Sequence, residues 1–323
     1  MWTALAVASA FLLGLYDVAK KQALRKNGVL AVLLVATALS ALFTSPFLRF
    51  GPALDHLKLG LKAVLVTLSW ISGMIGLKLL PLTTVSMLKG SRPMFVVLFS
   101  IILFGETLSW TQWAGVLVVL AALFLLGWTS RGDAPVYVRK EGFIWMGLSI
   151  VTGVASALFD KHIMKGMEPL FVQSWTNLYI TVILSVLALI NHRAAIGRRE
   201  TAPEGLRFAH PSHRLRGGPL PLTCPRVDTV PQGQSPSGSP QQQRFQWDWW
   251  LVAVAVLITA ADALYFFALK QPDALLSVIS LIRRASVIIT FICGIIFFKE
   301  KNVGAKSLNL LLLAAGVVLL LIG

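Results

Sequence analysis

Four positively charged side chains stand within two long apolar stretches of this chain: Lys89, Arg92, Arg283 and Arg284. Lys89 and Arg92 are three residues apart, so they share one face of a helix. A charge at the centre of a membrane helix costs about 2.5–3.5 kcal/mol and is tolerated where it faces a cavity or a partner. We predict that the four cations line a central cavity and bind carboxylate or phosphate groups of a small solute. The alternative is that they pair with acids of neighbouring helices and hold the bundle together.

Three acids in apolar stretches are candidates for proton coupling or for ion pairs: Asp17, Asp160 and Asp262. Asp17 and Asp160 occupy matching places in two similar stretches, and for them a salt bridge to Lys89 or Arg283 and a role in proton coupling both stay open. Asp262 has no acidic counterpart. A carboxylate that is isolated in a low-dielectric environment takes up a proton more readily than one in water. We therefore predict that Asp262 is the coupling site.

Other polar side chains in the apolar stretches are candidate contacts. Tyr16, Asn177 and Tyr265 are predicted to contact the solute, with packing in the core or against lipid as the alternative. Glu106 and Glu300 each follow an apolar stretch, where a carboxylate is expected to cap a helix or to contact a neighbouring one.

Motifs of enzymes and of metal sites are absent from the sequence. It contains no GxSxG, HExxH, P-loop or GxGxxG pattern, which are the local signatures of several hydrolases and nucleotide-binding enzymes. The two cysteines form no CxxC and no Cys/His cluster. We expect no enzymatic activity, no metal and no cofactor.

The composition is that of a protein whose solvent is mostly lipid. Of its 323 residues, 56% are hydrophobic and only 13% are charged, whereas a soluble domain carries about 25% charged residues. The net charge of +15 does not predict nucleic-acid binding, because eight of the 29 Lys and Arg residues lie in 193–244 and most others flank apolar runs. Basic residues at helix ends are typical of membrane topology and of contact with anionic lipids.

Hydropathy predicts an all-α integral membrane protein with ten transmembrane helices. A bilayer core of about 30 Å requires about 20 apolar residues per helix. The predicted spans are 2–22, 29–48, 59–80, 82–104, 110–128, 142–164, 169–190, 249–270, 274–298 and 303–322. The segment 193–246 is rich in Pro, Gly, Gln and Arg, and we predict that it is a disordered loop.

The two halves of the chain resemble each other in order. Leu15-Tyr16-Asp17 recurs as Leu158-Phe159-Asp160, and Lys89 aligns with Arg283. The offset grows from 143 to 194 residues, an increase close to the length of the predicted loop, so the loop is explained as an insertion in the second half. We predict a first repeat at 1–128, a connection at 129–141 and a second repeat at 142–323. Five spans per repeat is an odd number, so the second repeat enters the membrane inverted, as in many transporters.

Residues 78–127 resemble the EamA-type branch of the drug/metabolite transporter superfamily. The resemblance rests on a proline before the fourth span, Pro93 within it, then Glu106 and the Gly115-Val116 pair. The second half repeats the pattern through Glu300, but it has Ser286 in the corresponding region and no proline, so a matching kink there lacks its usual cause. The resemblance implies a ten-helix fold, alternating access and, often, export of metabolites or amino acids.

The sequence thus predicts a secondary transporter in a bacterial inner membrane. Its expected partners are a small-molecule solute and membrane lipids, and no nucleic acid. It is expected to be a monomer or a homodimer. The alternatives are a flippase for a lipid-linked sugar or phospholipid and an integral membrane lipid transferase. Orientation stays open: Lys and Arg gather in the odd-numbered connections, which places both termini outside by the positive-inside rule, whereas the resemblance implies cytoplasmic termini.

Overall fold

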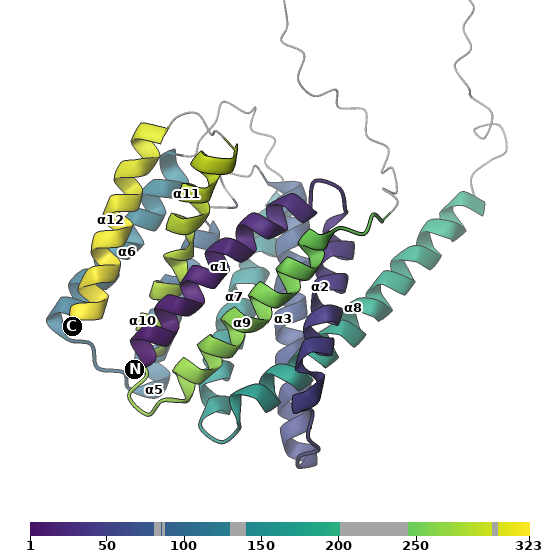
Figure 1. Cartoon of the computed structure of the whole chain (residues 1–323), viewed down its shortest axis with the longest axis horizontal. Coiled ribbons are helices and arrows are strands. Elements are labelled where there is room, and N and C mark those ends of the chain that lie inside the picture. Colours follow the sequence, from purple (N-terminus) through teal and green to yellow (C-terminus); the bar gives the residue numbers. More distant parts are fainter. Residues whose placement is uncertain (81–84, 86–87, 130–139, 201–244, 299–302) are drawn as a thin grey trace, which may run out of the picture.

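The computed structural model describes the chain except for residues 81–84, 86–87, 130–139, 201–244 and 299–302. In the described ranges the chain forms a bundle of helices (Figure 1). In chain order these are α1 (Trp2–Ala23), α2 (Val29–Thr44), the short 3₁₀ helix η1 (Ser45–Phe47), α3 (Ala53–Leu79), α5 (Arg92–Phe104), α6 (Trp110–Thr129), α7 (Lys140–Met164), α8 (Pro169–Glu200), α9 (Trp249–Lys270), α10 (Leu276–Arg284), α11 (Ser286–Phe298) and α12 (Val303–Ile322).

The helices have the length and composition of membrane spans, so the chain is a multi-pass membrane protein. Two described helical segments are apolar but shorter, Trp110–Leu125 and Leu308–Ile322. Seven described segments are long and apolar enough to cross a bilayer: Trp2–Ala23, Val29–Phe47, Ala53–Leu77, Lys140–Met164, Pro169–Ile190, Trp249–Lys270 and Leu276–Cys293.

The helix bounds correct the predicted spans at several places. α3 begins at Ala53 rather than at residue 59. α8 continues to Glu200, into the segment predicted to be a disordered loop, where Ala and Arg favour a helix. The ninth predicted span is two helices, α10 and α11, which meet at Ala285. Most of the predicted loop at 193–246, most of the connection at 129–141, and Glu300 lie outside the described residues.

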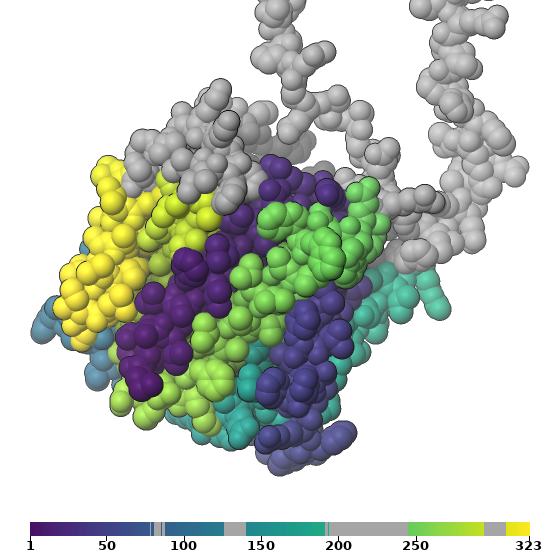
Figure 2. Space-filling model, in the orientation of Figure 1, coloured from purple at the N-terminus to yellow at the C-terminus, as the bar shows by residue number. Residues whose placement is uncertain are grey.

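Helices that are far apart in the sequence pack along one another. α1 lies along α9, α3 along α7, and α6 along α12. Figure 2 shows α1 and α9 side by side across one face of the molecule. α2 contacts both α8 and α9, while α3 also contacts α8; α1 contacts α11, and α5 contacts α7 and α10. Every one of these contacts joins a helix among α1–α6 to a helix among α7–α12, so the two halves of the chain are interleaved rather than segregated.

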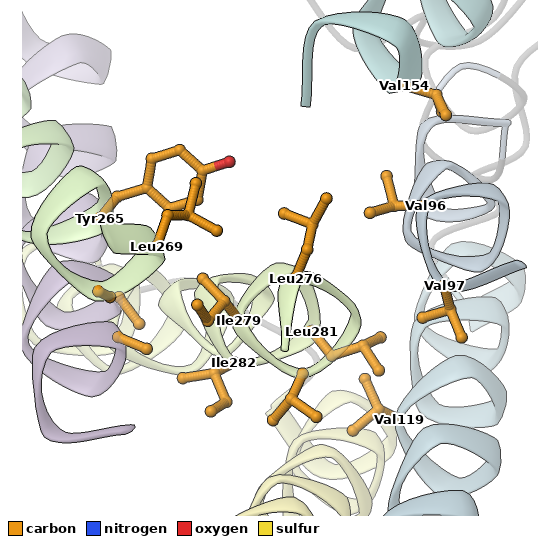
Figure 3. Close-up of a cluster of buried hydrophobic side chains, with 14 of the residues drawn as sticks. Val96, Val97, Val119, Val154, Tyr265, Leu269, Leu276, Ile279, Leu281 and Ile282 are labelled. Carbon is orange, nitrogen blue, oxygen red and sulfur yellow. The ribbon is translucent and has the colours of Figure 1, made fainter. Parts of the chain in front are cut away.

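The short helix α10 forms the centre of the apolar core. Leu276, Ile279, Leu281 and Ile282 are all fully buried. Figure 3 shows these side chains between α9 on one side and the valines of α5 and α6 on the other. The core therefore fixes the position of α10, and with it the two arginines at its end.

One end of the bundle is tied by a set of polar contacts between the α1–α2 turn and the start of α9. Asn27 exchanges hydrogen bonds of 2.9 and 2.8 Å with the backbone of Gln246, and Lys26 pairs with Asp248 at 3.0 Å. Asp248 also accepts a hydrogen bond from the backbone of Trp250, as the N-cap of α9. The hydrogen bond from Lys26 holds the pKa of the Asp248 carboxyl below its ordinary value. α9 is thereby anchored where it begins.

Candidate functional site

A helix discontinuity at Ser91 places the first pair of predicted cations. The Ser91 amide donates to the Leu88 carbonyl at 3.2 Å, and the Met94 amide donates to the Ser91 carbonyl at 3.0 Å. Both bonds span three residues rather than four, so the helix tightens to 3₁₀ geometry at this point. Lys89 and Arg92 flank this tightening, with Lys89 exposed and Arg92 half-buried.

A second discontinuity, at Ala285, places the other pair. The Ala285 amide donates to Ile282 and the Ile288 amide donates to Ala285, both at 2.9 Å. The same three-residue bonds therefore recur 194 positions later. Arg283 and Arg284 precede this break and are both half-buried. The break at Ala285 therefore forms without a proline in the position of Pro93.

The four predicted cations lie near one another. α5 packs against α10, which brings Arg92 within electrostatic reach of Arg283 and of Arg284. Lys89 is within reach of Arg92, of Arg284 and of Lys20 in α1. The structure thus gathers the four cations of the two breaks and Lys20 of α1 into one region, which we call the cation cluster: Lys20, Lys89, Arg92, Arg283 and Arg284.

Arg92 is held by the backbone of α7. Its guanidinium donates to the carbonyl of Gly153 at 2.5 Å. A Cβ added at Gly153 would overlap the guanidinium, so only glycine leaves room for Arg92 in this position. The hydrogen bond fixes the direction of Arg92 without neutralising its charge.

Asp262 is not isolated, which corrects the premise of its predicted role. Its carboxylate accepts a hydrogen bond from Arg283 at 2.7 Å, and its side chain is 35% exposed. Arg283 also lies over the ring of Tyr265, with 4.2 Å from the guanidinium carbon to the ring centre. A cation on an aromatic face beside a carboxylate is stabilised by both groups. Tyr265, predicted to contact the solute, is buried beneath Arg283.

Asp160 pairs with Lys62, a residue that the sequence analysis missed. The two charged atoms are 2.9 Å apart, and the side chains are only 10% and 3% exposed. The Tyr265 hydroxyl donates to the other carboxylate oxygen at 3.4 Å. Asp160 therefore pairs with neither Lys89 nor Arg283, the partners considered from the sequence. The predicted start of α3 at residue 59 put Lys62 at the membrane surface; the true start at Ala53 places it two turns inside the helix.

The remaining predicted residues divide between the cluster and elsewhere. Asp17 is within electrostatic reach of Lys20 and Arg284. Tyr16 lies under the Lys20 ammonium, 5.3 Å from it to the ring centre. Asn177, in α8, is half-buried, and no contact among the described residues joins it to the cluster.

Glu106 makes the helix-capping and inter-helix contacts expected of it. Gly105 ends α5 with a φ of 63°, a left-handed conformation that glycine adopts readily, and so turns Glu106 toward α10. The carboxylate accepts from the backbone amides of Leu276 at 2.7 Å and Ser277 at 3.1 Å, and from the Ser277 hydroxyl. Lys161, at the end of α7, forms an ion pair with the same carboxylate. We call this group the Glu106 cluster.

Two cavities lie apart from the cations. An apolar groove of about 680 Å³ runs between α1 and the end of α12, lined by residues such as Val7, Phe11 and Leu321. A smaller one of about 220 Å³ lies between the start of α3 and the end of α7, beside Asp55 and His162. Neither is lined by a member of the cation cluster, so a cavity at the cluster stays a prediction.

Comparison with known proteins agrees with this architecture. One solved crystal structure of a protein covers 99% of this chain, and 98% of its own length, with a TM-score of 0.66 at 14% sequence identity. At that identity the likeness concerns the fold alone, which is that of a polytopic helical bundle. No curated protein matches the chain in sequence.

A family model matches the first part of the chain. Residues 1–128 match the family model described as the EamA-like transporter family, which is part of the drug/metabolite transporter superfamily. The predicted resemblance to this family is thereby confirmed over residues 1–128, and the matched family is one of membrane transporters.

Proposed function

We propose that this chain is a secondary active transporter that moves a small polar or anionic metabolite across a bacterial inner membrane by alternating access. It would bind the solute at the cation cluster, between the break at Ser91 and the break at Ala285. Its partners would be the solute and membrane lipids, and it would act as a monomer or a homodimer.

The observation that carries the proposal is the surplus of positive charge at the two helix breaks. The cation cluster holds five cations, whereas the acids beside it are Asp17 and Asp262; Asp160 is held by Lys62. Uncompensated charge inside a membrane protein is costly and generally marks a ligand or ion pathway. A solute with one or more negative charges would supply the missing counter-charge.

Two inverted five-helix repeats, 1–128 and 142–323, account for the packing. Let α1 correspond to α7, α2 to α8, α3 to α9, α5 to α11 and α6 to α12. Exchanging the repeats then turns the contact α1–α9 into α7–α3, which is also observed. In the same way, α2–α9 becomes α8–α3 and α1–α11 becomes α7–α5, and both of these contacts are present. The pairs α2–α8 and α6–α12 map onto themselves. Such exchange is what a two-fold axis in the membrane plane produces, and it allows a central site to open to either side.

The test is untargeted metabolite profiling of cells and medium for the wild type and for Lys89→Ala and Arg283→Ala. We expect a metabolite whose distribution shifts on overexpression of the wild type and does not shift with either variant, although both variants insert in the membrane normally. Lys58→Ala is the control, since Lys58 is a half-exposed lysine paired with Asp55 at 3.6 Å, and surface pairs contribute little.

Unchanged transport in both variants would refute the assignment of the site. A change in the leaflet distribution of a lipid-linked sugar or a phospholipid, with unchanged soluble metabolites, would instead identify a flippase.

A further inference from the structure

The Lys62–Asp160 pair is the most deeply buried ion pair in the described part of the chain. Lys62 in α3 and Asp160 in α7 approach to 2.9 Å with side chains 3% and 10% exposed. The Lys62 ammonium also lies over the ring of Phe266, 4.0 Å from its centre. A buried pair of this kind is a poor device for stability alone, because desolvation of two charges offsets most of their attraction.

Every helix packed against α7 presents a charged or titratable group to Asp160. α3 presents Lys62. α5 presents Arg92, which is within electrostatic reach, and α9 presents Tyr265, which donates to the carboxylate, and Asp262. Arg283 of α10 is also within reach.

Tyr265 also connects Asp160 to the cation cluster by direct contact. The Tyr265 hydroxyl contacts Asp160, while the Tyr265 ring supports Arg283 from below. A displacement of Arg283 toward a solute would therefore change the position of Tyr265, and with it the contact of the Tyr265 hydroxyl with Asp160.

We propose that Asp160, held by Lys62, is the proton-binding group that couples this transporter to a proton gradient, and that its proton binds together with the anionic solute. The proposal rests on the proposed function, since it takes the cation cluster as the solute site. It replaces Asp262 as the coupling residue.

Charge balance explains why solute and proton would bind together. The ion pair of Lys62 and Asp160 is neutral. When a solvent proton forms an O–H bond on the Asp160 carboxylate, the pair carries one positive charge, which the negative charge of a solute at Arg92 and Arg283 stabilises. The ammonium of Lys62 then loses its anionic partner and keeps the face of Phe266.

Exposure explains why Asp160 rather than Asp262 would take the proton. A solute that engages Arg283 would release Asp262, but that side chain is 35% exposed and, once hydrated, keeps its charge. Asp160 has no such access to water, so a change in the surrounding charge is compensated there by a proton.

The proton would also weaken the link between the two halves. Lys62 belongs to the first half and Asp160 to the second, and α3 lies along α7. A neutral Asp160 no longer attracts Lys62 as an ion, so α3 and α7 would separate more easily during the transition between the two open states.

The experiment measures proton uptake when purified full-length protein in lipid nanodiscs binds an anion in weakly buffered solution near pH 7. The probes are sulfate and lactate, neither of which exchanges protons near that pH, with binding measured by calorimetry and protons by an indicator dye. We expect close to one proton taken up per bound anion by the wild type and none by Asp160→Asn. Asp262→Asn should change the affinity for the anion, because Asp262 pairs with Arg283, but it should keep the ratio of one proton per bound anion.

Asp160→Asn leaves Lys62 buried without a partner and risks misfolding, so the double variant Lys62→Met/Asp160→Asn is measured beside it. The double variant removes both charges at similar volume, a replacement that proteins often tolerate. It is expected to bind the anion without taking up a proton.

The outcomes separate the two proposals. Anion binding with proton uptake that persists in the double variant, or that is lost in Asp262→Asn instead, would overturn the coupling role of Asp160 and leave the solute site standing. Anion binding by the wild type with no proton uptake would do the same. Failure of both probes to bind the wild type would overturn the anion site itself, and with it both proposals.

Discussion

The Glu106 cluster and the cation cluster are two charged regions of the same bundle with opposite balance. At Glu106 one buried carboxylate receives four donors: the Leu276 and Ser277 amides, the Ser277 hydroxyl and the Lys161 ammonium. At the cation cluster, five basic side chains meet acids that are fewer in number.

The balance of charge distinguishes a cluster with a structural role from a candidate binding site. A carboxylate with every donor in place lowers the free energy of the folded state and has nothing left to bind with. A group of like charges raises that free energy, and persists because the surrounding helices hold it in place. Both regions lie on α10, whose first turn carries the Glu106 contacts and whose last turn carries Arg283 and Arg284. One helix is therefore anchored at one end and prepared for a ligand at the other.

The largest effect on stability is expected from Glu106→Ala, which removes the carboxylate of the Glu106 cluster. The substitution removes the acceptor of two buried amides at the start of α10 and the anionic partner of Lys161, whose ammonium keeps the hydrogen bond to the Ala274 carbonyl. We expect a loss of about 3–5 kcal/mol in the free energy of unfolding, which is typical for one partner removed from a buried charged group. Thermal unfolding in detergent, followed by tryptophan fluorescence, measures it.

Glu106→Gln is the matched control for that experiment. It keeps the shape and an amide oxygen as acceptor but loses the negative charge, so its melting temperature should fall between those of the wild type and Glu106→Ala. Equal melting temperatures for wild type and Glu106→Ala would show that Glu106 does not anchor α10.

Two lysine substitutions test the same comparison, with an expected effect on stability of intermediate size. Lys161→Ala removes a donor from a buried carboxylate and should cost about 1–3 kcal/mol of stability. Lys89→Ala removes one of several like charges, so stability should stay within about 0.5 kcal/mol of the wild type or rise, while transport is lost. The same unfolding measurement checks both. A large destabilisation by Lys89→Ala would mean that Lys89 has a structural partner, and the comparison would fail.

The smallest effect on stability, with a clear effect on binding, is expected from Gly153→Ala. The new methyl group displaces the Arg92 guanidinium, and its hydrogen bond to the Gly153 carbonyl is lost. Loss of one hydrogen bond to a charged group corresponds to about a tenfold or greater decrease in anion affinity, measured by calorimetry with sulfate.

Gly147→Ala, in the same helix, is the control for Gly153→Ala. A Cβ at Gly147 meets nothing within 4 Å, so affinity should be unchanged there. Equal affinities of the two variants for sulfate would show that Arg92 does not bind the anion.

The sequence predicted most of the helices because a membrane span has a strong and simple signal. Apolar runs of about 20 residues are recognisable one at a time, and the family motifs around Pro93 and Glu106 added the architecture. The pairs of cations at the two breaks followed from the cost of charge in lipid. Each of these features can be recognised within a short stretch of residues.

The ion-pair partners could not be predicted in the same way, because they depend on which helices face each other. Lys62 was overlooked since an error of six residues in the start of α3 moved it to the membrane surface. Asp262 was taken as isolated because its partner Arg283 is 21 residues away, on a different helix. The break at Ala285 was doubted for want of a proline, although the 3₁₀ geometry needs none.

Diffraction from crystals soaked in selenate tests the central claim most directly, because the selenium atom of this anion is located by its anomalous signal. The account predicts an anomalous peak between the two helix breaks, within hydrogen-bonding reach of the guanidinium groups of Arg92 and Arg283 or Arg284. A peak found only at basic residues of the helix ends, with the cation cluster accessible and empty, would contradict it.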